Sequence, residues 1–493
     1  MGGVVMHYIM SIDQGTTSTT VLIVDETLRV CASASREFAQ EYPQPDWVEH
    51  QPDRIWQSVL SAIGEAIANA RIDAHAIIAL GITNQRETTV IWDRKTLKPI
   101  YNAIVWQCRR TAPICAQLKD DGLEPMIRQK TGLLCDPYFS ATKIRWILEH
   151  TGTMNAAQAG ELAFGTIDTW LLSQLTGGEV HATDPSNASR TLLMDLETLD
   201  WSDELLEIFN IPRAILPTIM PNATIYGRTK KVPGLPDGIP IAGMAGDQQA
   251  ALFGQYCFQA GEAKCTFGTG AFLLLNTGNE IIHSKHGLLS TCAWQLKNET
   301  TYALEGSAFV AGALVQWFRD SLGMIDNAAQ IEDLAKSVDD DAGVVVVPAL
   351  TGLGAPYWRP EARGTITGLT RATTKAHIAR AALMGIAQQN TDLLEAMTAD
   401  LGKSLTSLKV DGGASVNDLL MQMQADLLNC TLYRPECLQT TALGAAMLAA
   451  LGIGRFASTQ DLIECSRNSG IFDPKQSHDW RTQKRTAWKK AIG

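Results

Sequence analysis

Three loops that combine glycine, hydroxyl residues and an aspartate are the places where this sequence could do chemistry. They span residues 13–18, 243–250 and 411–417, and Asp247 lies in the middle one. Glycine lets the backbone approach phosphate oxygens, hydroxyl and N–H groups donate to them, and an aspartate can hold Mg²⁺ or accept a proton. One such loop is a weak signal, but three in one chain favour a phosphotransferase.

Other nucleotide-binding layouts are excluded by their missing motifs. The sequence has no G-x-x-x-x-G-K-[ST] run and no His-Arg-Asp catalytic loop, which excludes the Walker and protein-kinase arrangements. No G-x-G-x-x-G follows a predicted strand, so a dinucleotide site is not expected.

The loops need strands and helices to position them. Residues 7–12 and 19–24 read as a hairpin over a Gly/Thr turn, and the same pattern of strand, turn and strand recurs at 265–275. Pro52 opens a helix whose apolar residues Ile55, Val59, Ile63 and Ile67 recur every four positions. Further strands are predicted at 77–82, 88–92, 344–347 and 408–410, and further helices at 138–150, 308–321 and 377–397.

The recurring hairpin predicts two similar halves. At 493 residues the chain exceeds the size of a single hydrophobic core. We therefore expect an α/β protein with two related domains, residues 1–254 and 255–493, and a cleft between them.

The composition is that of an ordinary globular protein, with 45% apolar and 19% charged residues. A net charge of −11 without a long basic run argues against nucleic acid or an anionic membrane as a partner. Ten scattered cysteines without a C-x-x-C pair predict reduced thiols. Because neither a signal peptide nor a long apolar segment is found, we expect a cytoplasmic protein without membrane insertion.

Several runs resemble the FGGY carbohydrate kinases, which have the actin/hexokinase ATPase fold, and within that family the branch that acts on glycerol. The runs lie at 12–17, 81–88, 102–110, 136–140, 187–191, 246–250, 352–358 and 411–414. Those at 84–88 and 106–110 are specific, whereas the loops at Asp13 and Asp411 are shared by the wider superfamily. The resemblance implies two ribonuclease H-like (actin-like ATPase) domains with an interdomain cleft, the phosphate loop and glycerol pocket on the first and the adenosine side on the second.

For glycerol, the resemblance implies that Asp247 is the general base. The glycerol-binding residues it implies are Arg86, Glu87, Trp106, Tyr138, Asp247, Gln248 and Phe272. From the residues alone, simpler roles stay open. Asp247 could cap the following helix through Gln248, Arg86 and Glu87 could be a surface ion pair, and Trp106 and Phe272 could be core aromatics.

For Mg-ATP, the resemblance implies that Asp13 holds Mg²⁺. The nucleotide positions it implies are Thr16, Thr17, Ser18, Thr20, Thr269, Gly312, Gln316, Gly413 and Asn417. The simpler alternative for Gly412 and Gly413 is a plain turn.

Two positions and one segment depart from the family pattern. Thr20 stands where an arginine usually contacts the transferred phosphate, so a fixed positive charge is missing. Met384 stands where an acidic or amide residue is usual, which predicts a repacked helix face. Residues 227–238 lack the glycine-dense loop that binds fructose 1,6-bisphosphate in some bacterial relatives, so we expect weak or absent inhibition by that compound.

Together these features predict ATP-dependent phosphorylation of glycerol to sn-glycerol 3-phosphate. Because members of the family are usually dimers or tetramers, the resemblance also implies a homodimer or homotetramer. Two alternatives stay open: a family kinase for another polyol or a ketose, and a regulatory protein that has lost phosphotransfer.

Overall fold

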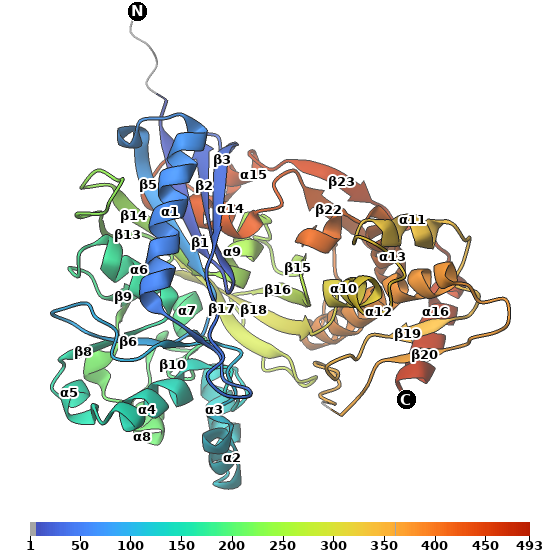
Figure 1. The fold of residues 1–493 in the computed structure, drawn as a ribbon, viewed down its shortest axis with the longest axis horizontal. Coiled ribbons are helices and arrows are strands. Elements are labelled where there is room, and N and C mark those ends of the chain that lie inside the picture. Colours follow the sequence, from blue (N-terminus) through green and yellow to red (C-terminus); the bar gives the residue numbers. More distant parts are fainter. Residues whose placement is uncertain (1–5, 360) are drawn as a thin grey trace, which may run out of the picture.

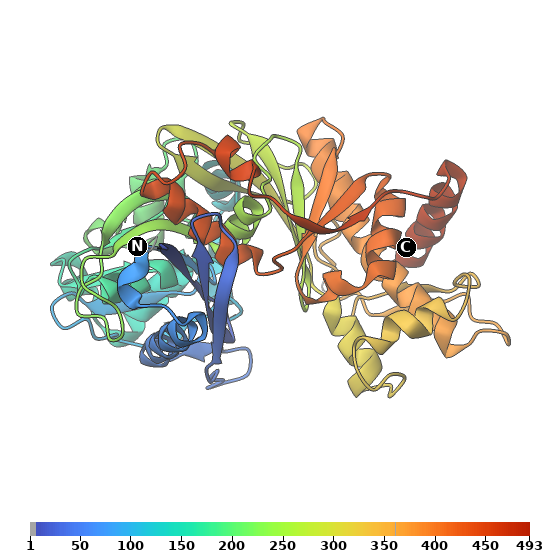
Figure 2. The ribbon, with the colours of Figure 1, turned by 90° about the horizontal axis from the view of Figure 1, so that it is seen from above.

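The computed structural model describes residues 6–359 and 361–493, so the first five residues of the predicted N-terminal domain lie outside it. Two lobes lie side by side, one from roughly the first half of the chain and one from the second (Figures 1 and 2). In the described residues, no helix is both long enough and apolar enough to cross a bilayer.

The first lobe is built on a six-stranded sheet with the order β13-β14-β5-β1-β2-β3. The strands are β1 (Tyr8–Gln14), β2 (Ser18–Asp25), β3 (Val30–Glu37), β5 (Ile77–Asn84), β13 (Ala223–Arg228) and β14 (Pro240–Gly246). β1, β2 and β3 form an antiparallel meander, while β5 and β14 run parallel to β1.

The second lobe repeats this arrangement in a seven-stranded sheet with the order β17-β18-β16-β15-β21-β22-β23. Its strands are β15 (Ala263–Phe267), β16 (Ala271–Gly278), β17 (Leu289–Leu296), β18 (Glu299–Ala308), β21 (Ser407–Asp411), β22 (Thr431–Pro435) and β23 (Asn468–Phe472). β15, β16 and β18 are antiparallel, and β21 and β22 run parallel to β15. The expected two related α/β halves are therefore confirmed.

Helices complete the two lobes, and only some of them pack directly on the large sheets. In the first lobe they are α1 (Pro52–Ala70), α2 (Ala112–Asp120), α3 (Glu124–Thr131), α4 (Ser140–Thr151), α5 (Met154–Gln158), α6 (Ile167–Leu175), α7 (Pro185–Ala188), α8 (Asp203–Phe209) and α9 (Asp247–Gly254). The second half of the chain forms α10 (Gly312–Asp320), α11 (Gln330–Lys336), α12 (Lys375–Leu401), α13 (Asp418–Leu428), α14 (Thr440–Gly452), α15 (Thr459–Ile463) and α16 (His478–Ile492).

Short paired strands complete the fold. They are β4 (Glu49–His50) with β7 (Ala103–Ile104), β6 (Val90–Asp93) with β8 (Leu162–Gly165), β9 (Ala182–Thr183) with β12 (Thr218–Ile219), β10 (Met194–Asp195) with β11 (Asp200–Trp201), and β19 (Val345–Val347) with β20 (Thr365–Thr367).

One predicted boundary is wrong. The helix expected from residue 308 begins at Gly312, because Ala308 is the last residue of β18. The pair β17 and β18 was not predicted at all. The apolar run that includes Ala308 and Val310 fits the end of a strand as well as the start of a helix, and only the pairing of β18 with β16 and β17 resolves it.

Helix α14 follows the second lobe's strands in sequence but packs on the first lobe, where it contacts β1, β5 and β14 of the first sheet (Figure 1). Glycines allow this approach: a Cβ on Gly81 or Gly243 would overlap backbone atoms of α14, and one on Gly444 would overlap the Ala250 carbonyl of α9. The predicted boundary after residue 254 falls in the loop between α9 and β15.

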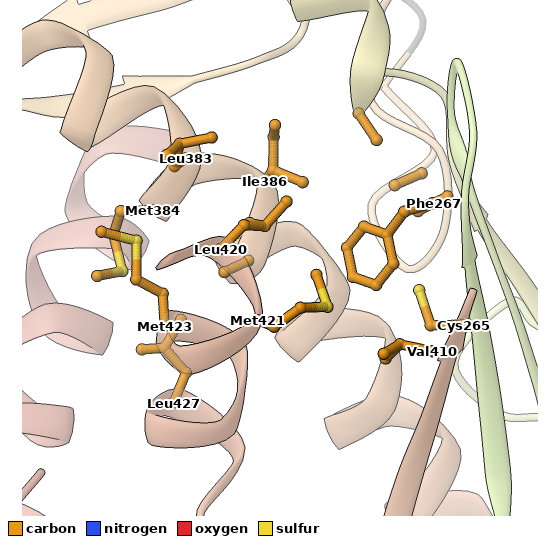
Figure 3. Close-up of a cluster of buried hydrophobic side chains, with 14 of the residues drawn as sticks. Cys265, Phe267, Leu383, Met384, Ile386, Val410, Leu420, Met421, Met423 and Leu427 are labelled. Carbon is orange, nitrogen blue, oxygen red and sulfur yellow. The ribbon is translucent and has the colours of Figure 1, made fainter. Parts of the chain in front are cut away.

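Met384 lies on α12 and belongs to the main core of the second lobe, together with Leu420, Met423 and Leu427 of α13 (Figure 3). An acidic side chain in this surrounding would be buried without a charge partner, which is costly. The apolar neighbours explain why methionine suits the position.

Candidate active site

Three parallel strands of the first sheet end level with one another. Gln14 of β1 and Gly246 of β14 both pair with Asn84 of β5, the last residue of its strand. Asp13, Arg86 and Asp247 therefore gather at the carboxyl edge of the sheet, where open α/β sheets bind their ligands.

Asp247 is the first residue of α9 and is half-buried. Its Oδ1 accepts a 2.7 Å hydrogen bond from the Gln248 backbone N–H and forms an ion pair with Arg86 Nε at 3.1 Å. Among the described residues no donor reaches Oδ2, so this oxygen is left to accept a proton. Gly246, and not Asp247, is the N-cap of α9; the bond to Gln248 N ties Asp247 to the first turn of the helix, and Oδ2 stays free for the role of base.

Burial raises the pKa of Asp247, and the positive charges of Arg86 and Lys264 oppose that rise. A carboxylate of this kind can take a proton from a hydroxyl group at the moment of attack.

Arg86 and Glu87 are buried, so the surface-pair alternative is wrong. Arg86 binds Glu305 of β18 through two hydrogen bonds of 2.6 and 2.9 Å. Glu87 accepts a 2.7 Å hydrogen bond from Arg190, which also donates to Glu305 at 3.0 Å. Two arginines and two glutamates alternate and thereby compensate each other's charge across the two lobes.

The carboxyl group of Glu305 is the most stabilised anion of this network. Burial would raise its pKa, but Arg190 and Arg86 outweigh burial and lower the pKa of Glu305 to about 2. Arg86 is thereby fixed with its remaining Nε on Asp247, so Glu305 of the second lobe holds a residue of the first lobe in place.

Glu87 has a left-handed backbone with φ of 60°, which is uncommon for a residue other than glycine. Its carbonyl accepts hydrogen bonds from Ser140 Oγ at 3.0 Å and from Lys143 Nζ at 3.2 Å. These two side chains of α4 stabilise the strained backbone at Glu87. Burial raises the pKa of the Glu87 carboxyl.

Trp106 and Tyr138 pack edge to face with ring centroids 5.5 Å apart, and both are half-buried. The Trp106 indole donates a 2.9 Å hydrogen bond to Thr16 Oγ1. Phe272 is also half-buried. Neither Trp106 nor Phe272 is therefore a fully buried core aromatic, and both leave surface for a small ligand.

The predicted phosphate loop is the turn that joins β1 and β2, closed by a 2.9 Å hydrogen bond from Gly15 N to Ser18 O. Thr16, Thr17 and Ser18 form this turn. Thr20 lies on β2, where its hydroxyl donates to Ser35 at 3.2 Å.

Asp13 suits a divalent cation. Burial and the nearby Asp247 carboxylate raise its pKa to about 7, and no donor among the described residues bonds to its side chain. No three His, Cys, Asp or Glu side chains in the described part of the chain converge on one metal position. The arrangement fits Mg²⁺ shared between one or two carboxylates and substrate phosphates.

The second lobe brings together most of the other predicted nucleotide residues. Ala311 N and Ala313 N donate to Thr269 O, and a Cβ on Gly312 would lie 2.6 Å from Gly268 O. Gly413 follows β21, the parallel neighbour of β15, and a Cβ there would meet nothing. The loops after β15 and β21 thus form one open edge.

Two further predicted nucleotide residues lie on helices at this edge. Asn417 caps α13 by accepting a 2.8 Å hydrogen bond from Leu420 N. Gln316 is exposed on α10, one turn after Gly312. Gly412, with φ of 85°, is a turn residue, as the simpler alternative required.

Sequence reasoning assigned no role to Glu305, Arg190 or Lys264. Lys264 is the single charge of β15, and Glu305 directly follows the run Tyr302-Ala303-Leu304 of β18; a charge in such a setting could have marked both residues. Arg190 lies in one of the family-like runs, but nothing in the sequence pairs it with Glu87.

Comparison with known proteins agrees with this geometry. Residues 8–254 match the N-terminal domain of the FGGY family of carbohydrate kinases, and residues 263–453 match its C-terminal domain. The chain belongs to the FGGY family of carbohydrate kinases. Within this family, the chain is 54% identical to the glycerol kinase of Myxococcus xanthus over 98% of both chains, and 53% identical to that of Desulfitobacterium hafniense over 98% of both.

A solved structure is similar over nearly the whole fold. The crystal structure of Plasmodium falciparum glycerol kinase with ADP superposes with a TM-score of 0.93 at 38% identity, covering 99% of this chain and 98% of the other. A ligand-bound xylulose kinase from Lactobacillus acidophilus shares the fold at 23% identity with a TM-score of 0.87.

Proposed function

We propose that this FGGY kinase transfers the γ-phosphate of ATP to a terminal hydroxyl of glycerol and forms sn-glycerol 3-phosphate. The observation that carries the proposal is Asp247, held by Arg86 and by its own helix so that one carboxylate oxygen stays free. The curated relatives at 53% and 54% identity are glycerol kinases, which supports glycerol as the substrate.

In this mechanism Asp247 accepts the proton of the attacking hydroxyl, while Arg86, Glu87, Tyr138 and Gln248 bind the glycerol oxygens. Trp106 and Phe272 contact its carbon edge. A triol needs both donors and acceptors, and these side chains supply both. Closure of the lobes would exclude water, which would otherwise compete for the phosphate.

The nucleotide would lie on the residues predicted for it, with its phosphates at 16–18 and Thr269 and its adenosine at Gly413. Asp13 would hold Mg²⁺, which when bound offsets the negative charge of the phosphate oxygens. ADP in the Plasmodium falciparum structure supports an adenine nucleotide at this site.

The proposal includes two domains, residues 1–254 and 255–493. It also includes a cytoplasmic location and assembly as a homodimer or homotetramer. All ten cysteines are free, which supports a reducing compartment. Size-exclusion chromatography with light-scattering detection would measure the mass of the assembly and so its oligomeric state.

The test is ADP release with Mg-ATP and a panel of glycerol, dihydroxyacetone, erythritol, ribulose, xylulose and gluconate, with Asp247→Ala as the control. Turnover on glycerol that is lost in Asp247→Ala supports the proposal. Turnover on only a longer substrate would move the chain to another branch of the family, and none at all would favour a regulatory role.

A further inference from the structure

The side chain of Lys264 is fully buried where the two lobes meet, and the function proposed above does not use it. Lys264 lies on β15, beside α9 and its Asp247. Its Nζ donates to Gln248 Oε1, to Thr266 Oγ1 at 2.9 Å and to the Phe272 carbonyl at 3.3 Å. Two of these three partners are predicted glycerol-binding residues.

An ammonium group has three N–H donors and no acceptor. Gln248 must therefore turn its amide oxygen, and not its nitrogen, towards Lys264. The Gln248 Nε2 then points elsewhere, and it has no hydrogen-bond partner among the described residues. Gln248 is half-buried, so this amide nitrogen is available to a ligand.

We propose that Lys264 is a positioning residue that fixes the Gln248 side chain so that it donates to a hydroxyl oxygen of glycerol. The inference rests on the proposed function and deepens it, because it states the direction of one substrate hydrogen bond. Without Lys264 the Gln248 amide can rotate and present either atom.

The charge of Lys264 has a second effect, on the base. Asp247 is faced by Arg86 after β5, Lys264 on β15, Glu305 on β18 and Asp13 on β1. Burial lowers the pKa of Lys264, whereas Asp411 and Asp247 raise it. Loss of this positive charge raises the pKa of Asp247, so the base is protonated at a higher pH.

The test compares Lys264→Met with the wild type in steady-state kinetics at several pH values. We expect the KM for glycerol to rise about 10-fold and the KM for ATP to stay within about 2-fold, as for loss of one hydrogen bond to the substrate. The acidic limb of kcat/KM moves to higher pH. Lys409→Met is the matched control, because Lys409 pairs with Lys264 across β15 and β21 but packs on Tyr433.

A double-mutant cycle separates positioning from packing. In a Gln248→Ala background, Lys264→Met should raise the KM for glycerol no further. An unchanged KM and an unchanged pH limb in Lys264→Met would overturn the inference. A wild type that turns over no glycerol would overturn both the inference and the proposed function, whereas an active wild type with an unaffected Lys264→Met would overturn the inference alone.

Gln248→Glu covers the case in which Lys264→Met does not fold, as judged by its circular dichroism melt. A carboxylate keeps the partner of Lys264 but has no N–H to donate. A KM for glycerol as high as that of Gln248→Ala supports the inference, and a wild-type KM overturns it.

Discussion

The Trp106 indole and the Thr16 hydroxyl are joined by a 2.9 Å hydrogen bond, so a predicted wall of the glycerol pocket is tied to the predicted phosphate loop. A shift of one should move the other. The two substrates of a phosphotransferase must be aligned with each other. This contact couples the position of the glycerol pocket to that of the phosphate loop.

Trp106→Phe keeps an aromatic ring but removes this hydrogen bond, and Thr16→Val removes it from the other side. We expect each variant to raise the KM for ATP about 2- to 10-fold, the value of one hydrogen bond. The double variant should be no worse than the poorer single variant. An additive loss, measured by initial rates over an ATP series, would show that the contact does not couple the two pockets.

Asp247→Asn keeps the size of the side chain but removes the base. We expect kcat to fall by about 100-fold or more, because general-base assistance is lost. Since burial raises the pKa of Asp247, wild-type kcat/KM should fall as the pH drops through a value above the usual carboxyl range of about 4. A rate of Asp247→Asn close to that of the wild type would assign the base elsewhere.

Asp13→Asn tests the proposed cation site through stability. The pKa of Asp13 is raised to about 7, so the folded protein disfavours its ionised form and loses stability as the pH rises from about 4 to 7. Without nucleotide or Mg²⁺, Asp13→Asn should therefore melt at a higher Tm than the wild type at about pH 8, and this advantage should shrink as the pH falls towards 4.

The same melts serve as the control for ligand binding. Mg-ADP should raise the Tm of the wild type more than that of Asp13→Asn, because a ligand stabilises the state to which it binds. Equal Tm values for the two proteins at about pH 8, with equal responses to Mg-ADP, would argue against Asp13 as the cation ligand.

Local pattern was enough to predict the strand ends that carry Asp13, Asp247 and Gly413, because an apolar run followed by a glycine is encoded in neighbouring residues. The bond between Arg86 and Glu305 joins residues 219 apart, and its register depends on how the two sheets meet. No periodicity carries that information. The surface-pair alternative for Arg86 and Glu87 failed for the same reason, since residues far away in the sequence cover them, Glu305 for Arg86 and Arg190 for Glu87.

Thr20→Arg tests whether the missing positive charge limits the enzyme. Arg36 on the neighbouring strand β3 pairs with Glu65 and lies opposite Thr19, not opposite Thr20, so it does not replace the missing charge. We expect Thr20→Arg to raise kcat/KM for ATP about 10-fold or more, as for a charge-assisted hydrogen bond to phosphate. Ser35→Ala removes only the hydroxyl group that accepts a hydrogen bond from Thr20, so it should leave kcat/KM for ATP unchanged.

Gly444→Ala should destabilise the protein, because a Cβ at this position would overlap the Ala250 carbonyl where α14 crosses α9. Helix α9 begins with Asp247, so we expect the same variant to lose activity as the crossing widens. We expect the free energy of unfolding to fall by about 1–3 kcal/mol or more, as for other overpacked sites. Gly64→Ala in α1 is the matched control, since its Cβ meets nothing within 4 Å and should stabilise the helix by about 1 kcal/mol. Urea unfolding of both variants measures the difference, and a Gly444→Ala protein as stable as Gly64→Ala would show that the helix crossing adapts without cost.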